Sequence, residues 1–233
     1  MGHSSGLRKL FAPGLLAVRQ NWPPIVVIQV VAVCLLCMYY GVSAFHQGLD
    51  QLARMKDAGG LAASAIISAI AGGIVPEIAK SVTGRIRRYD WAWIEKTAWT
   101  ALIYGLLGIT VALLYRTQTY LFGSSRDLRT LTCKTSLDML GYTPFFSIPF
   151  ACTMLAFYEA RYRWKTLAAA LRDSFFAKRV IPSLVSCWAF WIPVLYCVYA
   201  FPLPIQFLIA MLAQAAWVVI FVFMNTPDAE AAA

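Results

Sequence analysis

Charged residues are scarce in this chain and unevenly distributed. Of its 233 residues only 13% are charged, whereas 60% are hydrophobic, and the segment 180–227 contains no Asp, Glu, Lys or Arg. A typical soluble domain carries about 25% charged residues. The composition therefore argues against an ordinary water-soluble domain and indicates a protein that lives in a membrane.

Residues that usually carry catalysis are also few. His3 and His46 are the only histidines, and both lie outside the hydrophobic blocks. The chain has no nucleophile elbow, zinc-protease helix or phosphate-binding loop, and Cys34-x-x-Cys37 has no histidine or second cysteine pair beside it. We therefore predict no enzymatic activity, no metal site and no cofactor. An intramembrane enzyme, the minor alternative, would need a second acid or a histidine facing Glu77.

The hydrophobic residues come in blocks of about 20, the length of helix that crosses the roughly 30 Å hydrocarbon core of a bilayer. No period-two alternation is present, which argues against a membrane barrel. The predicted fold class is all-α, a polytopic helical membrane bundle with six spans. The predicted spans are 24–45, 61–82, 97–115, 139–158, 183–200 and 205–224. The predicted domains are a basic amphipathic N-terminal segment (1–23), a helical transmembrane domain (24–224) and a polar tail (225–233).

Two prolines interrupt the uncharged segment in Phe201-Pro202-Leu203-Pro204. Each proline removes a backbone donor and disfavours helical geometry in the residue before it. We therefore expect 183–200 and 205–224 to form an antiparallel hairpin that is buried in lipid. Whether 183–200 crosses the membrane fully or is re-entrant stays open.

The net charge of +9 comes from basic residues in short loops beside the predicted spans. Summed over alternate sides, Lys and Arg number 14 on the side of the termini and 6 on the other side. The positive-inside bias then places both termini on the cytoplasmic or matrix side, and we predict no nucleic-acid partner. Apolar residues recur at helical spacing in the basic connection 159–182. This predicts a surface helix that binds anionic headgroups, or a plain basic linker.

Small residues recur every four positions in the second predicted span and end at an acid. The two stripes are Ser64-Ser68-Gly72-Pro76 and Ala65-Ala69-Gly73-Glu77. Such a face lets another helix approach closely, and glycines just before a proline favour a kink. Because a carboxylate at membrane depth is costly, Glu77 is either a pore-lining or proton-responsive group, or one half of an ion pair with Lys80.

Asp138 opens the fourth predicted span, where an acid suits the positive end of a helix and can pair with Lys134. We interpret it as a helix cap. Pro144 and Pro149 follow in the same span. They predict a bent, partly polar helix that borders a cavity, because the backbone groups freed by proline need partners.

Several motifs agree in order and spacing with one known family over about 61–224. The matching segments are Gly72-Gly73-Ile74-Val75-Pro76-Glu77; Gly108 with Tyr115-Arg116 and Gly123; Lys134, Asp138 and Pro144; Trp164-Lys165-x-Leu167; and Trp191-Ile192-Pro193 with Phe201-Pro202-Leu203-Pro204. Through them the chain resembles the Mpv-seventeen / PMP-twenty-two family of mitochondrial inner-membrane and peroxisomal proteins, as a divergent member. Gly73 and Glu77 stand where that family carries Asp and Gln.

The resemblance implies a channel or pore-like conduit for small solutes or ions. It also implies the mitochondrial inner or peroxisomal membrane in a eukaryote, and the inner cell membrane in a bacterium. The candidate pore-lining or functional residues are Glu77, Gly72, Gly73, Pro76, Tyr115, Arg116, Asp138, Pro144, Trp191 and Pro193. The alternative is a non-transporting structural or assembly protein that binds partner helices through the small-residue face of the second span. Either function has the lipid bilayer as a partner and is compatible with a homo-oligomer.

Overall fold

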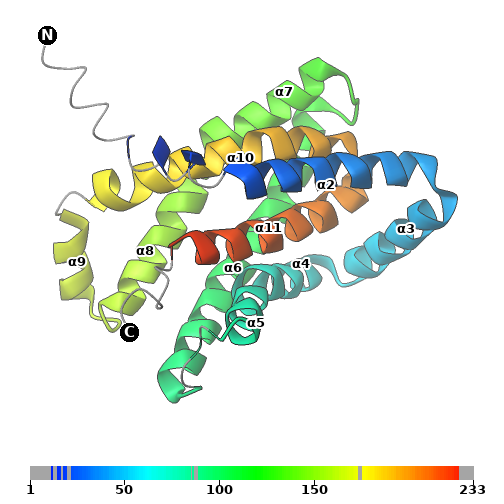
Figure 1. The fold of residues 1–233 in the computed structure, drawn as a ribbon. Coiled ribbons are helices and arrows are strands. Elements are labelled where there is room, and N and C mark those ends of the chain that lie inside the picture. The colour runs from blue at the N-terminus through cyan, green and yellow to red at the C-terminus, as the bar shows by residue number, and fades with distance from the viewer. Residues whose placement is uncertain are drawn as a thin grey trace, which may run out of the picture.

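The chain is described by a computed structural model, which covers residues 12, 15–16, 18–19, 22–84, 86, 89–172 and 175–225. Every regular element in this part of the chain is a helix (Figure 1). In chain order they are α2 (Trp22–Gly41), α3 (Ser43–Ala58), α4 (Gly60–Ala69), η1 (Ile70–Ile74), α5 (Val75–Val82), α6 (Trp91–Phe122), α7 (Leu128–Ser136), η2 (Leu137–Ser147), α8 (Ile148–Glu159), α9 (Trp164–Arg172), η3 (Phe176–Val180), α10 (Ile181–Ala200) and α11 (Leu203–Asn225). The all-α prediction is confirmed for this part. The predicted segments 1–23 and 225–233 lie largely outside it.

Several of these helices are long and apolar enough to cross a membrane. The four continuous ones are Gly60–Val82, Trp91–Phe122, Leu128–Glu159 and Phe176–Ala200. Helices α2 and α3 pass the same test only as a pair bent by 102°, and α11 adds an apolar helix over Leu203–Val219. The apolar helices suggest a membrane-embedded protein, with four or five spans among the described residues. Six spans stay a prediction.

The first span ends earlier than the sequence suggests. Val42 has an extended backbone, with φ −122° and ψ 106°, so α2 stops at Gly41 and the chain turns sharply into α3. The segment that we predicted as a polar connection is therefore helical. Its inner side contains Leu49, Ala53 and Lys56, which are buried, whereas Gln47, Gln51 and Arg54 are exposed.

Each of the three π-helical segments in the described chain lies directly before a proline. Pro76, Pro149 and Pro182 are each the second residue of the α-helix that follows η1, η2 or η3. A proline there has no N–H to donate, and the wider π turn accommodates the missing hydrogen bond. The kink predicted at Gly72-Gly73 is thus a π segment, and the bend predicted in the fourth span is the longer segment η2.

The small-residue face of α4 packs against α6. Ser64 and Ser68 are fully buried. A Cβ added at Gly108 of α6 would lie 2.7 Å from the carbonyl oxygen of Ser64 and 2.9 Å from the Oγ of Ser68. Two helix backbones come this close only where neither carries a large side chain. The packing role predicted for this face is confirmed, with a partner in the same chain.

The α10–α11 hairpin forms the core of the bundle. Phe190, Val194 and Val198 of α10 are completely buried, and most residues of the first half of α11 are buried. Helices α2, α3, α6 and the α4–η1–α5 stretch surround the pair. The hairpin is therefore buried mainly in protein, whereas we expected lipid. Large apolar side chains are exposed on the outer helices instead, among them Val27 and Val30 of α2, as expected where lipid replaces water.

Contacts between loops define two ends of the bundle. At one end, the Tyr40 hydroxyl donates to the carbonyl of Ala200 at 2.8 Å, and the guanidinium of Arg126 lies 5.0 Å from the Tyr40 ring centroid. At the other end, Arg161 lies 3.7 Å from Glu95. The 41–43 bend, the 123–127 loop and the 201–202 turn thus share one end. Helix α6 therefore runs from the end that contains Glu95 to the end that contains Arg126, and the α7–η2–α8 stretch runs back to the end that contains Arg161. Successive passes through a membrane require this alternation.

Helix α9 lies in the basic connection 159–182. Leu167 is buried and Leu171 is half-buried, whereas Lys165 and Arg172 are exposed, so the helix is amphipathic. Trp164, which the spacing places on the apolar face, is 71% exposed. Its binding to anionic headgroups stays a prediction.

Candidate functional site

A cavity of about 130 Å³ lies inside the bundle, between α6, η2–α8, α10 and α11. We call it the central cavity. Most of its walls are apolar, but a few polar side chains reach it. These are Tyr104, Tyr115, Asp138, Tyr142, Thr143 and Gln214. An internal space with a small number of convergent polar groups is the usual form of a site that binds or passes a small molecule.

Asp138 is the acid of this cavity. It is 6% exposed and lies in the π turn of η2. The Tyr199 hydroxyl donates to its Oδ2 at 2.6 Å, and the Thr143 hydroxyl donates to its Oδ1 at 3.2 Å. These two bonds offset part of the cost of placing a carboxylate in an apolar bundle. Tyr199 of α10 thus holds one carboxylate oxygen of Asp138, and Thr143 of η2 holds the other.

The cap that we assigned to Asp138 belongs to Asp127. The fourth helix begins at Leu128, because Asp127 accepts hydrogen bonds from the backbone N–H of Thr130 at 2.9 Å and from its hydroxyl at 2.9 Å. Hydrogen bonds from Ser125 and Thr130 hold the pKa of Asp127 at about 2. The interpretation of Asp138 as a cap is therefore wrong. It lies ten residues inside the helix, at the depth of the cavity.

A second buried polar group lies toward the α7 end of the same helices. Gln118 is completely buried and donates from Nε2 to the carbonyl of Lys134 at 3.1 Å. Lys134 is 2% exposed, and its ammonium donates to the Thr119 hydroxyl at 3.4 Å rather than to Asp138. The Gln118 Oε1 atom has no hydrogen-bond partner among the described residues. Buried polar atoms are usually paired, so this amide oxygen is available to accept a hydrogen bond from a polar molecule.

Tyr115 connects the central cavity to a second hollow, which we call the end hollow. The end hollow also measures about 130 Å³ and is lined by Lys56, Arg116 and Phe207 besides Tyr115. Tyr115 is 4% exposed, and its ring meets the Tyr199 ring edge-on with centroids 5.3 Å apart. The end hollow lies beside the α10–α11 turn. Tyr115 is therefore the shared wall between an internal space and one end of the bundle.

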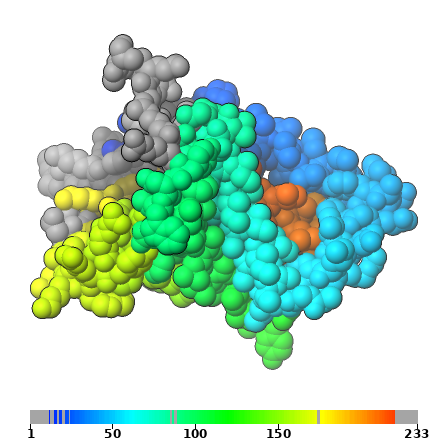
Figure 2. Space-filling model, turned by 90° about the horizontal axis from the view of Figure 1, so that it is seen from below, coloured from blue at the N-terminus to red at the C-terminus, as the bar shows by residue number. Residues whose placement is uncertain are grey.

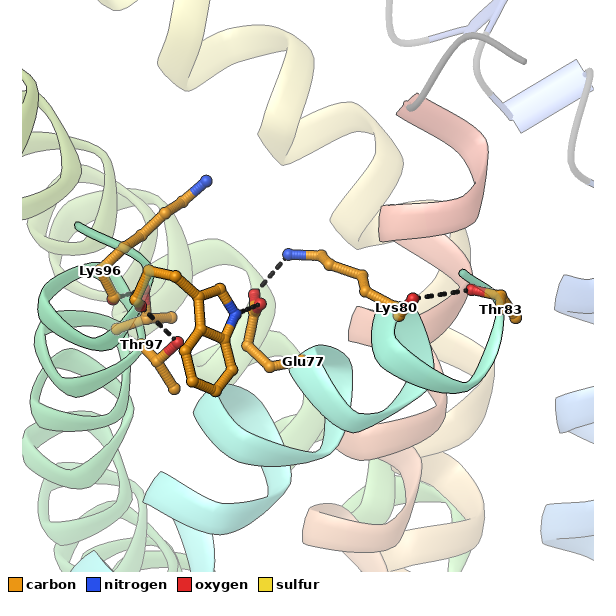
Figure 3. A network of polar contacts seen from close by, with 7 residues as sticks. Glu77, Lys80, Thr83, Lys96 and Thr97 are labelled. Atoms are coloured by element: carbon orange, nitrogen blue, oxygen red, sulfur yellow. Dashed lines mark hydrogen bonds and ion pairs between the residues drawn. The ribbon is translucent and has the colours of Figure 1, made fainter. Parts of the chain in front are cut away.

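Glu77 lies away from the central cavity. Its Oε1 forms an ion pair with Lys80, and the Trp93 indole N–H donates to its Oε2 at 2.8 Å (Figure 3). The Glu77 side chain is only 13% exposed, and both of its carboxylate oxygens have a partner. The geometry matches the ion pair that we considered from the sequence, between Glu77 in the first turn of α5 and Lys80 in its last turn.

Gly72, Gly73 and Pro76 are buried behind the cavity wall. A Cβ on Gly73 would lie 2.6 Å from the Cα of Ala101, and one on Gly72 would meet the Tyr104 ring and lie 2.6 Å from Gln214 Nε2. This small-residue face is occupied by α6 and α11 of the same chain. It is not available to a partner helix, so the assembly role that we based on it does not hold.

The other candidate residues divide between the cavity and the surface. Trp191 lines the central cavity, and Pro144 is partly buried within η2. Arg116 and Pro193 are exposed, Arg116 at the end hollow and Pro193 on the outer side of α10. Tyr115, Asp138 and Trp191 thus all line the central cavity, whereas Glu77 and Pro193 do not.

Sequence reasoning missed Gln118, Tyr104 and Gln214 as neighbours of this site. Gln118 fell outside the predicted third span, because α6 continues to Phe122. A glutamine within an apolar helix is itself a signal, because it needs an internal partner in the membrane. Gln214 follows that rule, with its Nε2 donating to the Ser68 hydroxyl at 3.5 Å.

Among the described residues, no three His, Cys, Asp or Glu side chains lie close enough together to hold a metal ion. The comparisons with known proteins add no assignment. No family model matches the chain, and neither the curated proteins nor the solved structures give a significant match. The site is therefore characterised by its geometry: a buried carboxylate in a small cavity among apolar helices of membrane-spanning length.

Proposed function

We propose that this protein is a multi-pass membrane protein that forms a conduit for small solutes or ions, with the central cavity as its polar section. The observation that carries the proposal is Asp138, a carboxylate buried inside the bundle at the wall of a cavity. Intramembrane acids in such positions are commonly part of ion or proton pathways. We also propose, from the motifs given above, a divergent relationship to the Mpv-seventeen / PMP-twenty-two family.

The size of the cavity limits what passes. About one probe sphere, 10–15 Å³ of such volume, is enough for one water molecule, so 130 Å³ accommodates several waters or a small ion. A metabolite of drug size needs a site of roughly 300 Å³ or more. The proposed solutes are therefore the smallest ones.

Tyr115 is the proposed constriction. It separates the central cavity from the end hollow, where Lys56 is neutralised by Asp57 and Arg116 faces outward. Inside, the Asp138 carboxylate favours cations over anions. We further propose that the protein is not an enzyme and that both termini face the cytoplasmic or matrix side of an inner or organelle membrane.

Flux through proteoliposomes tests the proposal. We expect wild-type protein to pass small cations faster than protein-free vesicles do, and to exclude solutes above a few non-hydrogen atoms. Asp138→Asn should lower cation flux relative to anion flux, whereas Tyr115→Ala should raise flux of all small solutes because it removes the shared wall. Glu77→Gln is the matched control, since it neutralises a paired carboxylate outside the cavity.

The proposal is wrong if wild-type vesicles show no flux above the protein-free background. It is also wrong if Asp138→Asn and Glu77→Gln change ion preference equally, because the effect would then be one of overall charge. Each variant is first checked for a monodisperse peak in detergent and an unchanged helical circular-dichroism spectrum.

A further inference from the structure

A long apolar groove runs between α3, the α4–η1–α5 stretch and α11. Figure 2 shows it as a hollow with α11 at its floor and α3 and α4 along its rim. Its volume is about 530 Å³, and its lining includes Leu52, Ile67 and Leu212. We call it the α3–α11 groove. Its size lies within the range of sites that hold a small molecule or part of a larger one.

One charged group lies at the end of this apolar groove. Lys56 lines both the groove and the end hollow. It is 8% exposed, its ammonium lies 3.0 Å from the Asp57 carboxylate, and it lies 5.1 Å from the centroid of the Phe207 ring. Arg116 lines the same end hollow and is exposed. Two cations, Lys56 and Arg116, and one acid, Asp57, therefore line the hollow into which the apolar groove leads.

Helix α3 forms one side of this junction. The 102° bend turns α3 away from the direction of α2, and Lys56 lies on its buried side together with Leu49 and Ala53. A short amphipathic helix beside a spanning helix typically lies in the interface plane, with its cations at the headgroups. Leu52 and Met55, which line the groove, are 53% and 65% exposed. The groove is thus open to the outside of the bundle along α3.

We propose that the α3–α11 groove binds one acyl chain of an anionic phospholipid, whose phosphate contacts Lys56 and Arg116. The apolar walls match the chain, and the two cations outnumber the single acid, Asp57. Asp57 is 45% exposed, so it stays hydrated when the Lys56 ammonium turns toward the phosphate. This site is at the opposite end of the bundle from the basic connection 159–182.

Native mass spectrometry of the purified protein tests the proposal, with palmitoyl-oleoyl phosphatidylglycerol and phosphatidylcholine at equal concentration. We expect wild type to retain one phosphatidylglycerol in preference to phosphatidylcholine. Lys56→Met should reduce phosphatidylglycerol retention about fivefold without changing phosphatidylcholine retention. Lys96→Met, which removes a lysine at the other end of the bundle, is the control and should have no effect.

A second pair of variants tests the groove itself. Leu212→Trp fills the groove and should reduce retention of both lipids. Leu102→Trp makes the same change on α6, outside the groove lining, and should not. If Lys56→Met does not fold, variants of the exposed residues Arg116 and Asp57 test the same site. Arg116→Gln should weaken phosphatidylglycerol binding, and Asp57→Asn should strengthen it.

Equal retention of the two lipids by wild type would overturn the proposal. So would a Lys56→Met protein that folds and keeps the preference, or Arg116→Gln and Asp57→Asn variants that leave binding unchanged. A dimer mass free of lipid would identify a second copy of the chain as the occupant, and would also overturn it. Because binding is measured without flux, these outcomes are independent of the proposed conduit.

Discussion

Gly108 and Gly105 lie one turn apart on α6 and face the same helix, α4, at different distances. A Cβ at Gly108 would lie 2.7 Å from the Ser64 carbonyl oxygen and still closer to the Ser68 Cβ. A Cβ at Gly105 would lie 3.4 Å from the Ala65 carbonyl oxygen. Non-bonded carbons prefer about 3.5–4.0 Å. Gly108→Ala must therefore push α4 and α6 apart, whereas Gly105→Ala needs little movement.

The difference between these two variants isolates the clash. Replacing glycine by alanine in a helix gains about 1 kcal/mol of helix propensity, and this gain is the same at both positions. Overpacking costs about 1–3 kcal/mol. We therefore expect Gly108→Ala to be less stable than Gly105→Ala by about 1–3 kcal/mol in the free energy of unfolding.

Denaturant titration in detergent micelles, followed by circular dichroism, measures this difference. Adding Ser68→Gly to Gly108→Ala removes the nearest atoms and should recover part of the loss, which a double-mutant cycle quantifies. Equal stability of the two alanine variants, or no recovery with Ser68→Gly, would refute the packing of α4 on α6.

The remaining predictions concern hydrogen bonds to carboxylates. Tyr199→Phe removes the 2.6 Å bond to Asp138 and should destabilise the protein by about 1–3 kcal/mol, measured by the same titration; an unchanged midpoint would contradict the buried pair. Trp93→Phe removes the indole donor to Glu77 and should cost about 1.5 kcal/mol, while flux through proteoliposomes stays at the wild-type level. The pKa of Asp127 is lowered from 3.8 to about 2 by its hydrogen bonds, so the ionised form stabilises the folded state above about pH 4. That contribution is lost as the pH falls toward 2. The stability difference between wild type and Asp127→Ala should therefore shrink over this range, and a constant difference would argue against the cap.

Features that depend on neighbouring residues were predictable from the sequence. The double proline after Ala200 ends α10 and starts α11, because proline acts on the residues beside it. The glycines before Pro76 mark the π segment η1 for the same reason. The extent of α6 and the start of α7 were missed, because polar residues after Tyr115 suggested a loop while Asp127 and its partners cap a new helix.

The environment of the candidate site was not predictable in this way. Asp138 looked like a helix cap from its neighbours, and its decisive partner, Tyr199, lies 61 residues away. For Glu77 the sequence left two roles open, a pore-lining acid or an ion pair with Lys80, and only the structure shows that Lys80 and Trp93 pair with it. A carboxylate's role depends on what surrounds it in space, and the local sequence does not contain that information.

The sequence by itself determined that the chain is helical and apolar in long blocks, and that the last block breaks at its two prolines. Only the tertiary structure decided which apolar faces meet each other and which remain outside. The reason is physical: lipid tails are as apolar as leucine, so a residue that faces lipid and one that faces another helix satisfy the same hydropathy. Phe190 and Val27 are both apolar residues within apolar stretches of the sequence. Phe190 lies in the core and Val27 on the surface, and only the packing of the helices distinguishes them.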